Sequence, residues 1–151
     1  MDANPRIMIE LTHCPIEIGA LIKHAKRLDC GALVTFTGTV REITGTHRTI
    51  ALTYEAYEPM AKAKMEFISN DAINRWSLGS VSIVHRLGKC LPGDIAVAVI
   101  TAAPHRAEAF AACAWLMDEI KRIVPIWKEN TDSDGIANWV HPKTNELGTN
   151  R

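Results

Sequence analysis

The chain has 151 residues, of which 47% are hydrophobic and 23% are charged, an ordinary balance for a globular protein that buries one sizeable core. This composition excludes a disordered chain, a collagen-like repeat and a coiled-coil rod. Lys and Arg total 17, as do Asp and Glu, and the cations are scattered along the chain, which argues against a nucleic-acid-binding protein.

The N-terminal third predicts a strand, a helix and a second strand. Residues 7–11 form a short apolar run typical of a strand, and Pro15 then suits the first turn of a helix with Cys14 at its N-cap. This helix is expected to end at residues 29–31, which include a glycine. Residues 32–40 are rich in Val, Thr and Phe and are typical of a strand.

The middle of the chain predicts a loop, a strand, a helix and a pair of strands. Residues 41–48 are polar and contain a glycine, so we expect a loop there, followed by a strand over 49–57. Pro59 opens a longer helix. The strands at 81–87 and 95–103 are joined by a Leu-Pro-Gly-Asp turn, and this short connection predicts an antiparallel pair.

The C-terminal third predicts one more helix and a hairpin. Pro104 starts the helix, which runs to about Val124 before a second proline stops it. Short apolar runs at 126–129 and 136–140 flank a polar turn and predict a β-hairpin. The residues from about 142 are expected to form a loose tail. Altogether the pattern predicts a single mixed α+β domain over the whole chain, with three helices and mainly antiparallel strands.

Several classes of protein are not expected. No uncharged stretch reaches the roughly 20 residues of a membrane-spanning helix, and the N-terminus lacks the apolar core of a signal peptide. The four cysteines contain no C-x-x-C pair, so we expect free thiols in a reducing cytoplasm rather than a cysteine metal site. The histidines form no ligand cluster either, and no metal is expected.

Two cations lie in the predicted first turn of the third helix. His105 and Arg106 add positive charge to a helix N-terminus, where unpaired amide groups already favour an anion, most naturally a phosphate. An ion pair between Arg106 and Glu108 is an equally good interpretation. Arg41 begins the 41–48 loop, where a solvated arginine is the favoured interpretation and a binding residue the alternative.

Two lysines bracket a proline and a tryptophan. Lys121 lies near the end of the third helix and Lys128 just beyond it. A lysine desolvated or crowded by another cation has a lowered pKa and could act as a nucleophile or proton carrier. Taken alone, solvated lysines are favoured by about two to one. Phe36 and Met117 are core residues on the same default interpretation.

Seven motifs, in order along residues 30–140, resemble the large, catalytic subunit of molybdopterin synthase. They are 34–41 (VTFTGTVR), 52–57 (LTYEAY) with Met60, 85–88 (HRLG), 92–94 (PGD), His105 with Arg106, 109–110 (AF), and 125–128 (PIWK).

The resemblance implies an α/β hammerhead fold and a sulfur-transfer reaction. In this family a small ubiquitin-like subunit carries a thiocarboxylate on its C-terminal glycine and inserts its tail into the large subunit. The large subunit binds cyclic pyranopterin monophosphate (precursor Z), which receives two sulfurs to form the dithiolene of molybdopterin. The resemblance also implies a central homodimer of large subunits within a heterotetramer, and no cofactor.

The resemblance assigns roles to residues. Lys121 and Lys128 match the family's active-site lysines. The residues expected to bind substrate or line its pocket are Phe36, Thr39, Val40, Arg41, His105, Arg106, Met117, Glu129 and Asn130, with Lys143 a weaker candidate.

Asn130 departs from the family, which commonly has an acidic residue two positions after the second lysine. Three interpretations stay open: the carboxylate is dispensable, Glu129 replaces it through a shifted strand, or activity is reduced. Reduced activity would fit a second hypothesis, a non-catalytic docking module for the ubiquitin-like partner. A phosphate-ester hydrolase, the third hypothesis, lacks an evident nucleophile.

Helix geometry adds one inference. His105 and Lys121 are 16 residues apart on one predicted helix, which places them roughly 24 Å apart along its axis. One small substrate cannot readily touch both, so a site that uses both is expected to take His105 and Arg106 from a neighbouring copy of the chain. Since sulfur would come from the partner's thiocarboxylate, none of the four cysteines is expected to carry it.

Overall fold

The computed structural model describes residues 4–135 and 137–140. Its elements, in chain order, are β1 (Arg6–Thr12), α1 (Ile18–Ala25), β2 (Ala32–Thr39), β3 (Ile43–Thr44), β4 (His47–Ala56), α2 (Glu58–Trp76), β5 (Ser80–Arg86), β6 (Gly88–Cys90), β7 (Ile95–Ala103), α3 (Arg106–Ile123), β8 (Ile126–Asp132) and β9 (Ala137–Val140). The predicted α+β class with three helices is confirmed.

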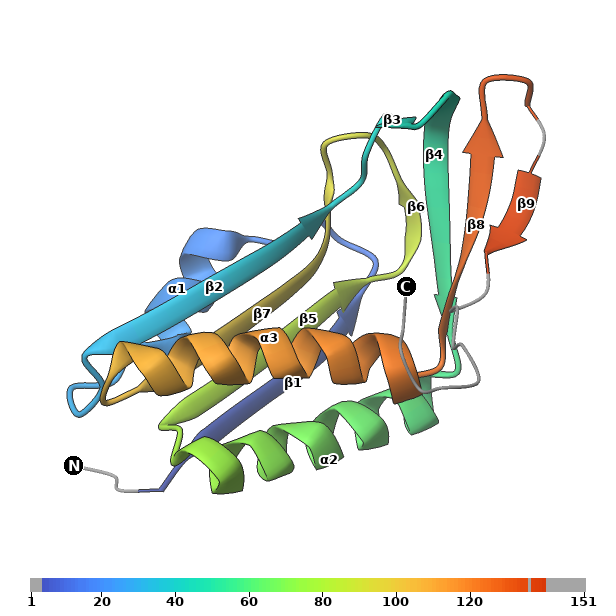
Figure 1. Cartoon of the computed structure of the whole chain (residues 1–151). Helices are drawn as coiled ribbons and strands as arrows, with labels where there is room; N and C mark the ends of the chain where they lie inside the picture. Colours follow the sequence, from blue (N-terminus) through green and yellow to red (C-terminus); the bar gives the residue numbers. More distant parts are fainter. Residues whose placement is uncertain (1–3, 136, 141–151) are drawn as a thin grey trace.

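Four strands form the first sheet, in the order β1-β5-β7-β2. β1 runs parallel to β5, and the other neighbours are antiparallel, including the predicted β5–β7 pair. α2 and α3 cover one face of this sheet, and α1 lies on the other (Figure 1).

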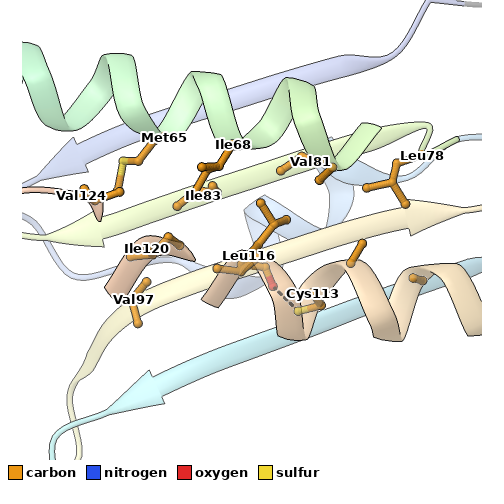
Figure 2. Packing of buried hydrophobic residues seen from close by; sticks show 14 of the residues in the cluster. Met65, Ile68, Leu78, Val81, Ile83, Val97, Cys113, Leu116, Ile120 and Val124 are labelled. Carbon is orange, nitrogen blue, oxygen red and sulfur yellow. Dashed lines mark hydrogen bonds between the residues drawn. The ribbon is translucent and has the colours of Figure 1, made fainter. Parts of the chain in front are cut away.

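The main core lies between this sheet and the helix pair. Because side chains alternate along a strand, Val81 and Ile83 of β5 both point toward the helices. Met65 and Ile68 of α2 point toward these two side chains (Figure 2). Leu116 of α3 completes the packing, and all five side chains are almost fully buried. Burying a side chain of this size contributes about 1.5–3 kcal/mol, so this layer holds the helices firmly on the sheet.

The second sheet has the order β3-β4-β8-β9, with β6 also paired to β4. It stands beside one end of the first sheet, where α3 ends and β8 begins (Figure 1). The backbone N–H of Tyr57 donates to the carbonyl of Pro125 at 3.2 Å and ties the end of β4 to the start of β8. This hydrogen bond therefore holds the α3–β8 connection against the end of β4.

The predicted start of the first helix is wrong. α1 begins at Ile18 with Glu17 as its N-cap, three residues beyond the proposed capping Cys14. The backbone N–H of Cys14 instead donates to the Thr12 hydroxyl at 3.1 Å, which holds this segment in a turn. The helix also ends early, at Ala25, and Leu28 is left 97% exposed.

The expected loop at 41–48 contains a tight hairpin. β3 pairs with the start of β4, and Thr44 faces His47 across a two-residue turn. Gly45 adopts φ +60° there, a conformation that favours glycine and suits such turns. The short strand β6 was also missed, and β8 extends to Asp132, beyond the predicted 126–129. The proposed tail from 142, with Lys143, lies outside the described residues.

Candidate active site

A cavity of about 900 Å³ opens where the two sheets and the end of α3 meet. Its walls come from the end of β2, the middle of β4, the last turns of α3, and β8. The lining residues used below are Phe36, Gly38, Thr39, Arg41, Tyr54, His85, Val97, Met117, Lys121, Lys128 and Asn130.

Three cations line this cavity: Arg41 after β2, Lys121 on α3 and Lys128 on β8. Among the described residues, no Asp or Glu lines it. Burial lowers the pKa of Lys128, and the nearby charges of Lys121 and Arg41 lower it further. A cationic, acid-free cavity attracts anions such as phosphate or a carboxylate-like group.

α3 places two of the lining residues together. Met117 and Lys121 are four residues apart and therefore lie on the same side of the helix, one turn from each other. The buried row of α3, which includes Leu116 and Ile120, holds this helix against the sheet. Lys121 itself is exposed and lines the cavity.

β8 separates Asn130 from Glu129. In the unbroken register with β4, Lys128 faces Tyr54, Glu129 faces Thr53 and Asn130 faces Leu52. Because strand side chains alternate, Lys128 and Asn130 share the face toward the cavity and Glu129 points to the other face. The strand shift that would let Glu129 replace the family's acidic residue does not occur. The buried Oδ1 of Asn130 has no hydrogen-bond partner among the residues that the structure describes.

The structure brings many of the expected site residues together and leaves others apart. Phe36, Thr39, Arg41, Met117, Lys121, Lys128 and Asn130 line the cavity. Val40 and Glu129 do not. Val40 is 4% exposed and packs in a small second core with Leu52 and Cys90.

His105 and Arg106 lie at the opposite end of α3 from the cavity. His105 is the N-cap residue of the helix and both side chains are exposed. The structure forms no ion pair between Arg106 and Glu108, both of which it describes, and the Oε2 atom of Glu108 is buried without a hydrogen-bond partner. Within one copy of the chain, these two cations therefore cannot join the cavity.

Tyr54 and His85 are among the lining residues that were not predicted as site candidates. Their rings meet edge to face, with centroids 4.9 Å apart. Burial raises the pKa of Tyr54 to about 12 and lowers the pKa of His85 to about 4, so both are uncharged near neutral pH. The alternation of Val81, Ile83 and His85 predicts that they share one face of the strand. It does not indicate that the core ends before His85 and that His85 lines a cavity.

None of the four cysteines, all of which the structure describes, lines the cavity. Cys90 and Cys113 are buried, Cys30 is half-buried and Cys14 is exposed. Within residues 4–135 and 137–140, no group of three or more His, Cys, Asp or Glu side chains could hold a metal ion, and no helix is long and apolar enough to cross a membrane.

Comparisons with known proteins agree on one family. The family model described as "MoaE protein" matches residues 11–123. The molybdopterin synthase catalytic subunit of Bacillus subtilis is 40% identical over 131 residues, which cover 87% of this chain and 83% of that protein. Its counterpart in Caulobacter vibrioides is 41% identical over 138 residues, 90% of either chain. The crystal structure of molybdopterin synthase from Staphylococcus aureus superposes with a TM-score of 0.82 at 39% identity and covers 87% of this chain and 95% of that one.

Proposed function

The chain belongs to the MoaE family, and from that premise we propose that it is the catalytic subunit of a molybdopterin synthase. It transfers sulfur from the thiocarboxylated C-terminus of a small ubiquitin-like subunit to cyclic pyranopterin monophosphate. The observation that carries this proposal is the cavity in which Arg41, Lys121 and Lys128 meet and which no acidic side chain of residues 4–135 or 137–140 lines.

The three cations suit both anions of this reaction. Arg41 can bind the substrate phosphate through two parallel hydrogen bonds. Lys121 and Lys128 can donate hydrogen bonds to the oxygen of the thiocarboxylate carbonyl as negative charge develops there. The lowered pKa of Lys128 makes its ammonium group a stronger acid than an ordinary lysine, so Lys128 can also donate and accept protons during the transfer.

The partner in this proposal is the small subunit, whose extended tail would deliver sulfur into the cavity. The assembly is a heterotetramer with a homodimer of this chain at its centre. Free cysteines fit a reducing compartment, and we place the reaction in the cytoplasm.

We also propose that each active site is shared between two copies of the chain. His105 and Arg106 lie roughly 24 Å along α3 from Lys121, so they would have to enter the cavity of a neighbouring copy. Mixed dimers of a His105→Ala chain and a Lys121→Ala chain should regain one competent site, whereas either homodimer should be inactive. Mixed dimers without any activity would refute the shared site.

The function is tested by single-turnover conversion of precursor Z to molybdopterin with thiocarboxylated small subunit. We expect robust conversion by the wild-type chain and a loss of about 10²–10³-fold in Lys121→Ala, the usual cost of removing a group that stabilises developing charge. Lys64→Ala, an exposed lysine on α2, is the matched control and should convert at the wild-type rate.

A docking module is the alternative that this assay separates. Asn130 lacks the carboxylate common in the family, and a chain that binds the small subunit without converting precursor Z would support docking alone. In that case Asn130→Glu is the next variant, because a carboxylate at this position would face the cavity beside Lys128.

A further inference from the structure

His85 stands where the core of the first sheet becomes the wall of the cavity. It follows Val81 and Ile83 on the same face of β5, and the side chains of these two residues pack beneath α2 and α3. Its neighbours at the same level of the sheet are Val97 on β7 and then Gly38 on β2. A Cβ on Gly38 would lie only 2.6 Å from Cγ1 of Val97, so a glycine is what lets the Val97 side chain pack here, and His85, Val97 and Gly38 all line the cavity.

The hydrogen bonding of His85 fixes which ring nitrogen carries the proton. Nδ1 lies 2.8 Å from the backbone carbonyl oxygen of Arg86. A carbonyl can only accept, so Nδ1 must donate its N–H to it. The ring is uncharged at neutral pH because burial lowers its pKa to about 4. Nε2 therefore carries a lone pair and acts only as an acceptor.

Tyr54 lies between His85 and the cationic part of the cavity. β4 runs between β6 and β8, and Tyr54 faces Gly88 on one side and Lys128 on the other. Its ring meets the His85 ring edge to face at 4.9 Å. The wall of the cavity thus changes from charged Lys128, across an aromatic ring, to the uncharged acceptor His85.

This order matches the two ends of a phosphorylated heterocycle. Lysine and arginine side chains carry donors alone, so they can hold a phosphate but cannot satisfy ring N–H groups. A buried N–H without an acceptor costs about 1–3 kcal/mol. The hydroxyl groups in the cavity can rotate to donate or accept, whereas Nε2 of His85 is fixed as an acceptor.

We propose that His85 is a further substrate-binding residue, whose Nε2 accepts a hydrogen bond from a ring N–H of the pterin while the phosphate lies at Arg41. The inference rests on the proposed function, since it takes precursor Z as the ligand. In this inference the neutral side of the cavity recognises the heterocycle, and the cationic side recognises the negative charge of the substrate.

Two amide substitutions separate the two ring nitrogens of His85. The side-chain N–H of His85→Asn can take the place of Nδ1 and keep the bond to the Arg86 carbonyl, but it leaves nothing at Nε2. The longer His85→Gln can place its amide oxygen near Nε2. By isothermal titration calorimetry, we expect the Kd for precursor Z to rise about 5–10-fold in His85→Asn, the usual worth of one hydrogen bond. The increase in His85→Gln should be smaller than 3-fold, which is roughly 0.7 kcal/mol.

Inorganic phosphate is the probe for the charged side, because it has no N–H group. Its affinity should be the same in His85→Asn as in the wild type. Equal affinity of His85→Asn and wild type for precursor Z would overturn the inference and leave the proposed function intact. An equal rise of the Kd for precursor Z in His85→Asn and His85→Gln would also overturn it. So would variants that bind the small subunit more weakly and precursor Z as well as the wild type does. A wild-type chain that binds the small subunit but not precursor Z would refute the proposed function, and the inference with it.

A measurement on the unsubstituted chain covers the case in which a variant fails to fold. In protein labelled with ¹⁵N-histidine, the resonance of the unprotonated Nε2 of His85 should move upfield when precursor Z is added, as that nitrogen accepts a hydrogen bond. It should stay in place when inorganic phosphate is added. A resonance that precursor Z leaves unmoved would overturn the inference.

Discussion

Acidification should destabilise this protein through His85. Its pKa is about 4 in the folded chain, against 6.5 for an unperturbed histidine, because burial disfavours the charged ring. The folded state therefore binds fewer protons than the unfolded state between these two values, so stability is full above pH 6.5 and falls as the pH drops toward 4. The shift corresponds to a total of about 3 kcal/mol, of which about 2 kcal/mol should be lost between pH 7.5 and pH 5.0.

Urea unfolding at these two pH values measures the effect, with His85→Asn as the reference chain. Asparagine does not titrate and can still donate to the Arg86 carbonyl, so other histidines contribute equally to both proteins. The wild type should lose about 2 kcal/mol more than His85→Asn on going from pH 7.5 to pH 5.0. Equal losses in the two proteins would show that His85 is not held in its neutral form, and would refute the reasoning.

Three further predictions concern the cavity and the core. In Gly38→Ala, the new Cβ would lie 2.6 Å from Cγ1 of Val97, so we expect a loss of about 1–3 kcal/mol by urea unfolding; wild-type stability would contradict the tight contact. Lys121→Gln removes a positive charge that lowers the pKa of Lys128, so acetylation of Lys128 by acetic anhydride, followed by peptide mass spectrometry, should slow at pH 8. An unchanged rate would mean that the two lysines do not interact. Leu116→Ala leaves a void in the fully buried layer beneath α3 and should cost about 2–5 kcal/mol, seen as a lower urea midpoint; a midpoint within error of the wild type would contradict this packing.

The strands of the first sheet and the two long helices could be predicted from the sequence because their signals are local. Pro59 and Pro104 mark helix starts, and the Leu-Pro-Gly-Asp turn is too short for anything but an antiparallel pair. The first helix was placed too early for the same reason. Its apolar spacing is a local pattern that does not show where the helix begins, and the backbone N–H of Cys14 donates to the Thr12 hydroxyl in the segment before α1.

The candidate site depends on contacts that no local pattern contains. Lys121 and Lys128 stood out because a proline and a tryptophan separate them, and the resemblance then gave them a role. His85 belongs to the HRLG motif of the resemblance, but its strand alternates as any core strand does, and neither observation gave it a role in the site. Only the packing of the second sheet against the end of the first exposes its ring and Tyr54 to the same cavity.

The central claim, that the cationic cavity performs sulfur transfer, is tested most directly by Lys128. The measurement is the single-turnover rate of molybdopterin formation with saturating precursor Z and thiocarboxylated small subunit, for the wild type, Lys128→Ala and the exposed control Lys89→Ala on β6. We predict a rate at least about 10²-fold lower in Lys128→Ala, the usual contribution of a positioned proton donor or charge-stabilising group, and the wild-type rate in Lys89→Ala. A Lys128→Ala chain that forms molybdopterin at the wild-type rate would contradict the account.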